Sequence, residues 1–102
     1  MPTNEELLQL LVGCNFDYLY RQLAEECCEL GQATLKMVRC MMGETPDSGR
    51  AVLEHYIEEL ADVGVMWNLA VANMEIAQRT QVNAIMNEKR NRMKERLERM
   101  KE

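Results

Sequence analysis

Proline, histidine and aromatic residues are scarce in this 102-residue chain. The two prolines, Pro2 and Pro46, leave long stretches free to form helices, because a proline inside a helix removes a hydrogen bond and clashes with the preceding turn. One Phe, one Trp and three Tyr against nine Met indicate an aliphatic, Met-filled core, which suits helix packing. No stretch alternates as a strand would. We therefore expect a single all-α domain over residues 1–102, a helical bundle of long antiparallel helices.

Net positive charge is also lacking, since the formal net charge is −5. A nucleic-acid polymer is bound largely through cations, so we expect no such partner. The four cysteines (Cys14, Cys27, Cys28, Cys40) form no Cys-x-x-Cys pair, and with His55 as the only histidine a zinc site would need scattered ligands. No leader segment or membrane-spanning run is visible. We expect a cytoplasmic protein with reduced thiols and no membrane partner.

Apolar residues recur at steps of three and four along three segments, which predicts helices over 17–42, 51–73 and 78–98. A short first helix is predicted to begin at Thr3, with Glu6 completing a capping box, and to break by position 15. The segment 43–49, which contains Pro46, predicts a loop. The highly charged end, residues 97–102, is expected to fray.

The apolar positions of the two central helices define the stripes that we expect to be buried. In the segment 17–42 they are Leu19, Tyr20, Leu23, Cys27, Leu30, Thr34, Met37 and Met41. In the segment 51–73 and just beyond it they are Leu53, Tyr56, Ile57, Leu60, Val63, Trp67, Ala70, Val71 and Met74. These stripes are too wide for a chain of this length to hide, so a homodimer or homotetramer is expected to complete the core.

Two pairs of acids lie beside these stripes, Glu26 with Glu29 and Glu59 with Asp62. Residues three apart lie on one helix face, and antiparallel packing would bring the two pairs together. Four clustered carboxylates repel one another unless a cation binds among them, and their hard oxygens favour Mg²⁺, Mn²⁺ or Ca²⁺. The alternative is a non-catalytic helical interaction module whose acids form a solvated face. Against it, the positions four residues on are Leu, Ala, Val and Met, not the Lys or Arg that usually pair with surface acids.

The acids also carry a resemblance to a known family. Glu25, Glu26 and Glu29, followed by Glu59 and Asp62, match Glu-Glu-x-x-Glu and Glu-x-x-Asp. This pattern resembles the hallmark of the MazG-like all-α nucleoside triphosphate pyrophosphohydrolases. That superfamily also includes dimeric dUTPases, dCTP pyrophosphatases and phosphoribosyl-ATP pyrophosphatases. A C-terminal basic segment similar to the family's lies over 87–96, so the resemblance covers roughly residues 16 to 97.

The resemblance implies an enzyme that cleaves a (deoxy)nucleoside triphosphate into a monophosphate and pyrophosphate, with Mg²⁺ or Mn²⁺ as cofactor. It implies metal ligands at Glu26, Glu29, Glu59 and Asp62, a proton acceptor at Glu26 or Glu29, and phosphate-binding cations at Lys89 and Arg92. Gln22, Trp67 and Asn68 are candidates to line the base pocket, although a place in the core is favoured for Trp67. The role of Glu25 is open.

A second enzymatic reading, phosphoribosyl-ATP pyrophosphatase of histidine biosynthesis, shares the metal motif and differs in a substrate pocket that the sequence does not define. The base, the sugar, and the choice between a normal and a damaged nucleotide also stay open.

Overall fold

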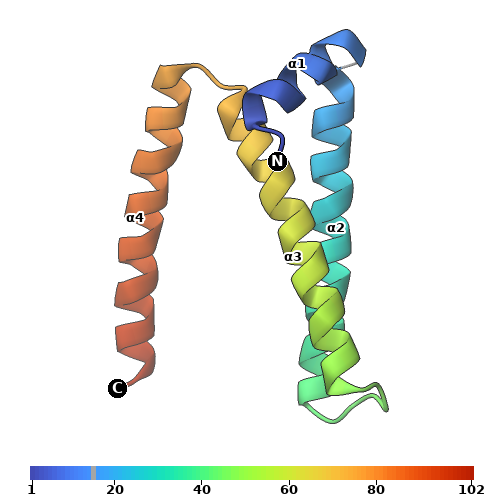
Figure 1. Cartoon of the computed structure of the whole chain (residues 1–102). Coiled ribbons are helices and arrows are strands. Elements are labelled where there is room, and N and C mark those ends of the chain that lie inside the picture. The colour runs from blue at the N-terminus through green and yellow to red at the C-terminus, as the bar shows by residue number, and fades with distance from the viewer. Residues whose placement is uncertain (15) are drawn as a thin grey trace. The chain divides into compact units, whose positions relative to one another are not determined.

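The computed structural model describes residues 1–14 and 16–102, and its regular structure is helical (Figure 1). The helices are α1 (Asn4–Cys14), α2 (Phe16–Met41), α3 (Gly49–Ala72) and α4 (Ile76–Met100). No strand occurs among the described residues, which confirms the all-α class. The three long helices begin and end within two residues of their predicted bounds. The predicted break at position 15 lies outside the described residues, and α1 continues as far as Cys14.

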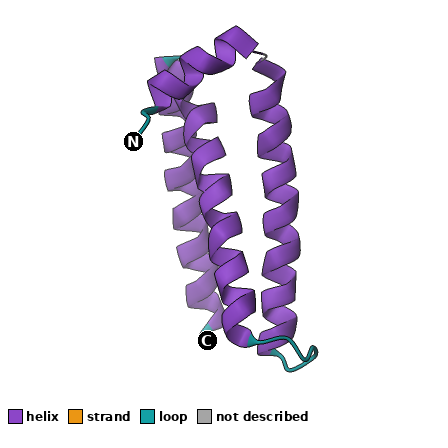
Figure 2. Cartoon of the chain, turned by 45° about the vertical axis from the view of Figure 1, so that its right-hand side comes forward, coloured by secondary structure: helices purple, strands orange, loops and turns teal. Residues whose placement is uncertain are grey.

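Contacts divide the chain into two units, residues 1–71 and 72–102. In the first unit, α2 and α3 are antiparallel and joined by a short loop at one end, while α1 lies at the other end (Figures 1 and 2). The buried apolar side chains are Leu19 and Ala33 on α2, and Val52, Leu69 and Ala70 on α3. The core of the unit therefore lies along the seam between α2 and α3, and the two acid pairs are on these same two helices.

Local signals in the sequence fix the start of α1. The Thr3 amide donates to Glu6 Oε2 at 3.1 Å, and the Glu6 amide donates to Thr3 Oγ1 at 3.1 Å. This is the predicted capping box, and it satisfies two amide groups that a helix start leaves without partners.

The loop between α2 and α3 is fixed from both sides. Gly43 has a φ of 74°, and the Glu44 amide donates to the Arg39 carbonyl at 2.9 Å, the pattern that ends many helices. On the far side, Ser48 Oγ accepts a hydrogen bond of 3.5 Å from the Ala51 amide at the start of α3. These two caps define the ends of the loop, after which α3 runs antiparallel to α2.

The prediction of the inward stripe on α3 is correct at Ala70, which is buried, but it is wrong at several of the large residues. Leu53, Ile57, Leu60 and Trp67 are 47, 54, 47 and 42% exposed, whereas Glu59 is only 9% exposed. The helix is therefore turned so that its acid-bearing stripe meets α2. Helix α3 is apolar around much of its circumference, so hydrophobicity alone does not select which stripe faces inward.

The second unit contains α4, which begins after a capping box formed by Glu75 and Gln78. The helix continues to Met100, two residues past its predicted end, and none of its described side chains is buried. Across the described part of the chain, no helix is both long enough and apolar enough to cross a membrane.

Candidate metal site

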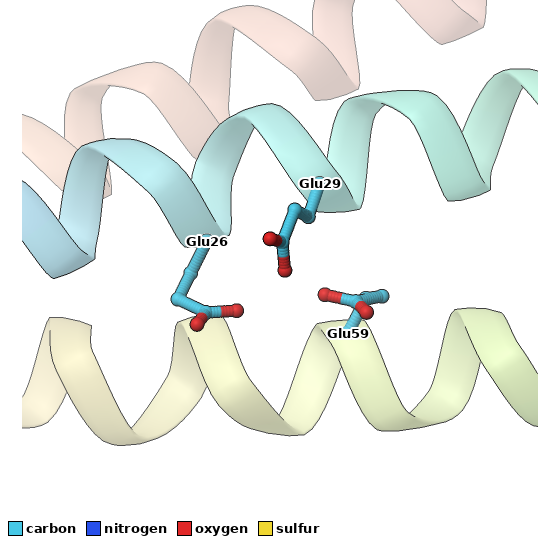
Figure 3. Close-up of side chains that lie close together, drawn as sticks. All are labelled: Glu26, Glu29 and Glu59. Atoms are coloured by element: carbon cyan, nitrogen blue, oxygen red, sulfur yellow. The ribbon is translucent and has the colours of Figure 1, made fainter.

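Three of the predicted metal ligands meet between α2 and α3. Glu26, Glu29 and Glu59 each offer a carboxylate oxygen, and these oxygens lie within 4.8 Å of one another. Figure 3 shows Glu26 and Glu29 extending from α2 and Glu59 from α3 into the same space. The three-residue step on α2 and the antiparallel course of α3 bring about this meeting, as the sequence predicted.

The cluster combines burial with unsatisfied oxygens. Glu59 is buried and Glu26 half-buried, while Glu29 is exposed. Glu26 Oε2 and Glu59 Oε2 are both buried and, among the described residues, accept no hydrogen bond. A buried carboxylate oxygen without a donor is costly, because it has lost water and gained nothing in return. Such an oxygen suits a proton or a cation.

The electrostatic environment of Glu26 and Glu59 favours their protonated forms. Burial raises the pKa of Glu26 above its ordinary value of 4.5, and the charges of Glu29, Asp62 and Glu59 raise it further. Burial likewise raises the pKa of Glu59, together with the charges of Glu29 and Asp62. His55, whose Nδ1 lies 3.9 Å from Glu59 Oε1, acts against that rise. A divalent cation would remove the repulsion that drives both shifts.

The fourth predicted ligand, Asp62, is exposed and does not belong to the group within 4.8 Å. Its charge nevertheless acts on both Glu26 and Glu59. Glu25, whose role the sequence left open, is exposed and accepts a hydrogen bond of 3.3 Å from Gln22 Nε2. The structure therefore brings together three of the four predicted ligands and leaves Asp62 close to them.

The predicted phosphate-binding cations, Lys89 and Arg92, are exposed on α4 and belong to the second unit. Their approach to the acids stays a prediction. In the first unit, Lys36 is exposed on α2. It lies seven residues after Glu29, two helical turns along the same stripe.

The structure also contains an apolar cleft that the sequence did not predict. Its volume is about 540 Å³, and it lies where α1 meets the start of α2 and the end of α3. The lining residues are Leu7, Leu10, Leu11, Asp17, Tyr18, Arg21, Val65, Met66 and Leu69. Such a volume falls in the range of small-molecule sites.

None of the three base-pocket candidates lines this cleft. Gln22 is half-buried and bonded to Glu25, while Trp67 and Asn68 are exposed. The sequence does carry one signal for the cleft: Met66 follows Asp62 by one turn on the acid-bearing stripe of α3. The contribution of α1 to the cleft has no such signal in the sequence.

Helical geometry places the cleft and the acids on one side of the α2–α3 pair. Tyr18 and Glu29 are eleven residues apart on α2, and Asp62 and Leu69 are seven apart on α3. Both spacings are close to whole numbers of turns. Arg21 precedes Glu26 by five residues, so the cleft begins roughly 8 Å along the helix from the acids.

No family model, no curated protein and no solved structure matches the chain. The resemblance to the MazG-like pyrophosphohydrolases therefore rests on the motif residues. The fold and the site together define an all-α protein with a carboxylate cluster between two antiparallel helices and an apolar cleft beside it.

Proposed function

We propose that the chain is a Mg²⁺-dependent nucleoside triphosphate pyrophosphohydrolase, releasing a nucleoside monophosphate and pyrophosphate. The observation that carries the proposal is the meeting of Glu26, Glu29 and Glu59, with two buried carboxylate oxygens that have no partner among the described residues. A solvated acidic face, as in a simple interaction module, would leave such oxygens in water. Carboxylate oxygens are also the ligands that Mg²⁺ and Mn²⁺ prefer.

In this proposal Glu26, Glu29 and Glu59 hold the cation, and the nearby Asp62 completes the set. When bound, the cation neutralises the triphosphate and makes an attacking water more acidic. Glu29 is the most exposed of the three clustered acids, so it suits the role of accepting the proton of that water. Glu59 is buried and Glu26 half-buried, and both have a buried oxygen without a partner among the described residues, so these two suit the role of ligands.

The apolar cleft supports a place for the base. It lies on the same side of the helix pair as the acids, about one to two turns along the helices, which is a span that the ribose of a nucleotide covers. Tyr18 offers an aromatic ring, and Asp17 and Arg21 offer polar groups at the edge of a largely apolar wall. We therefore assign the base to this cleft instead of to Gln22, Trp67 and Asn68.

The phosphates would extend from the acids in the direction away from the cleft, towards cations. Lys36 lies on the stripe of Glu29, on the side away from the cleft, and is the candidate within the first unit. Lys89 and Arg92 remain the candidates in α4. A cation at this position would stabilise the charge that develops on the leaving pyrophosphate.

The test is incubation of the protein with a panel of nucleoside triphosphates and phosphoribosyl-ATP, with Mg²⁺ and in ¹⁸O-labelled water. The proposal expects pyrophosphate as the released product and the label in the monophosphate, which reports attack at the α phosphorus. Label in the pyrophosphate would place the attack at the β phosphorus. Release of inorganic phosphate alone, or no cleavage of any compound, would exclude the proposed reaction.

A further inference from the structure

The acid-bearing side of the α2–α3 pair continues past the acids, in the direction away from the cleft. On α3, His55 precedes Glu59 by four residues, which places it about one helical turn beyond that acid. On α2, Lys36 follows Glu29 by seven residues, about two turns in the same direction because the two helices are antiparallel (Figure 1). Both spacings keep the residue near the stripe of its acid, and both residues are exposed. Two nitrogen-bearing side chains therefore follow the acids on this side.

His55 lies beside Glu59, the most buried of the clustered acids. Its Nδ1 is 3.9 Å from Glu59 Oε1, and its side chain is 52% exposed. At 3.9 Å the ring is adjacent to the carboxylate without donating a hydrogen bond to it. Among the described residues, no other group forms a hydrogen bond with the ring. His55 can therefore donate a ring N–H to a ligand that extends from the acids.

The first unit has few other cations. Its Lys and Arg residues are Arg21, Lys36, Arg39 and Arg50. Arg21 lines the cleft, on the other side of the acids. Glu26 extends towards α3 (Figure 3), and Arg39, thirteen residues later, lies about 140° around α2 from it. Neither arginine lies where phosphates leaving the acids away from the cleft would pass.

Arg50 is also directed elsewhere. It precedes Glu59 by nine residues, about two and a half turns, and so lies on the opposite side of α3. Its guanidinium forms an ion pair of 3.1 Å with Glu54. In the first unit, His55 and Lys36 are therefore the nitrogen donors that remain for phosphates beyond the acids.

From this placement we infer that His55, together with Lys36, binds the outer phosphates of a triphosphate whose first phosphate is held at the acids. The inference rests on the proposed function for the identity of the ligand, and it adds a phosphate-binding residue, His55, to that function. Lys36 supplies charge through a long, flexible side chain, whereas the imidazole supplies an N–H from a shorter and stiffer one. A neutral ring is sufficient for this role.

The distances along the helices agree with this assignment. At 1.5 Å per residue, His55 is offset by roughly 6 Å from Glu59, and Lys36 by roughly 10 Å from Glu29. The methylenes of Lys36 allow its ammonium group to reach back towards the acids. Both groups can therefore meet the part of a triphosphate that leaves as pyrophosphate in the proposed reaction.

The test measures the binding of inorganic tripolyphosphate, which has three phosphates and no base, by calorimetry at a fixed excess of Mg²⁺. Inorganic phosphate is the second probe, because a single phosphate held at the acids does not extend to His55. The proteins compared are the wild type, His55→Ala, His55→Gln, Lys36→Ala and the matched control Arg50→Ala. The control removes a full positive charge from α3 on the side away from the acids. The affinity for Mn²⁺ is measured separately by electron paramagnetic resonance.

His55→Ala should weaken tripolyphosphate binding about fivefold, as expected for one neutral hydrogen bond, and Lys36→Ala about tenfold or more. Both variants should change the affinities for inorganic phosphate and Mn²⁺ by less than about twofold. His55→Gln should stay within about twofold of the wild type for tripolyphosphate, because its amide also donates an N–H. Arg50→Ala should bind tripolyphosphate as the wild type does, and circular dichroism should show the same helical content throughout.

The inference would be overturned if the wild type bound no tripolyphosphate, or if His55→Ala bound it as tightly as the wild type. A loss in Arg50→Ala as large as that in His55→Ala would overturn it too, because it would show a general attraction of anions. A parallel loss of Mn²⁺ affinity in His55→Ala would mean that His55 acts through Glu59 and not on a phosphate.

The same probe separates this inference from the proposed reaction, because tripolyphosphate contains no nucleoside. A wild type that binds tripolyphosphate through His55 but cleaves no nucleoside triphosphate would exclude the reaction and support the phosphate-binding role. Cleavage by the wild type, with tripolyphosphate binding unchanged in His55→Ala, would support the reaction and exclude the role of His55.

Discussion

Glu26 of α2 and Glu59 of α3 approach each other across the helix seam, and each buries an oxygen that has no hydrogen-bond partner among the described residues. The two acids belong to different helices and are separated by 33 positions. The packing of α2 against α3 therefore keeps the two carboxylates close together despite their repulsion. Folding opposes such an arrangement unless a ligand offsets it. This conflict between fold stability and local charge is typical of functional sites.

Glu59→Gln should separate the two proposed roles of this carboxylate, which are to bind the metal and to repel the neighbouring acids when no metal is bound. Activity should fall by more than about a hundredfold, since even the outer partners of metal ligands contribute ten- to hundredfold. In the presence of a chelator the variant should melt at a higher temperature than the wild type, because one of the repelling charges is gone. Glu58→Gln is the matched control, since Glu58 is an exposed neighbour on α3. Glu58→Gln should change neither the activity nor the melting temperature. Equal activity of the two variants would contradict the proposed site.

The stability of the metal-free protein should depend on pH in a defined direction. Glu26 and Glu59 have raised pKa values in the folded chain, so the folded state binds their protons more tightly than the unfolded state. Their stabilising contribution is therefore complete below the ordinary value of 4.5 and is lost as the pH rises through the folded pKa values. The measurement is denaturant unfolding with a chelator at several pH values from 4.5 to 8.

Comparing the unfolding free energies of the wild type and Glu59→Gln separates the pH dependence caused by Glu59 from that of the other titrating groups. The difference in unfolding free energy should become less favourable to the wild type as the pH rises. Mg²⁺ at the higher pH should reverse the loss in the wild type and have a smaller effect on the variant. A difference that is independent of pH would show that Glu59 titrates as an ordinary exposed acid.

Gly43 and Gly49 flank the loop between α2 and α3 and should respond oppositely to alanine. Gly43 has a φ of +74°, which costs an alanine roughly 1 kcal/mol or more. Gly49 begins α3 with no positive φ and open space around its Cβ position, so alanine there should stabilise the protein by about 0.5 kcal/mol. Thermal unfolding of both variants measures the contrast. A neutral Gly43→Ala would mean that the turn adopts another conformation in solution.

The elements and the acids were predictable because their signals are local. Helix periodicity, the Thr3 capping box and the loop around Pro46 all depend on residues close together in the sequence. The meeting of Glu26, Glu29 and Glu59 needed only one further assumption, that α2 and α3 are antiparallel. A short loop between two long helices makes that arrangement the expected one.

The rotation of α3 and the position of the cleft were not predictable, because both depend on how the surfaces of different helices fit together. Helix α3 offers two adjacent apolar stripes, and the one that includes Leu53, Leu60 and Trp67 is the more hydrophobic. The chain instead buries Val52, Glu59 and Ala70. The choice depends on how two surfaces fit and on what covers the remaining stripe, neither of which is encoded in one helix.

The two assignments of the base pocket can be separated by one pair of variants. Met66→Trp places a large ring in the cleft, where Met66 is half-buried between the acids and Leu69. If the base lies there, the KM for the preferred triphosphate should rise by about tenfold or more, because the pocket loses the volume that the base needs. The acids are not altered, so the stabilisation by Mg²⁺ in a melting experiment should be retained.

Asn68→Ala is the matched control for that variant. Asn68 is exposed on α3 and does not line the cleft, so its loss should change the KM by less than about twofold, as expected of a surface position without contacts. The reverse outcome, a large effect of Asn68→Ala and none of Met66→Trp, would return the base to the side that the sequence first indicated. It would also place substrate beside Trp67. The same pair of KM values therefore decides between the two positions of the base.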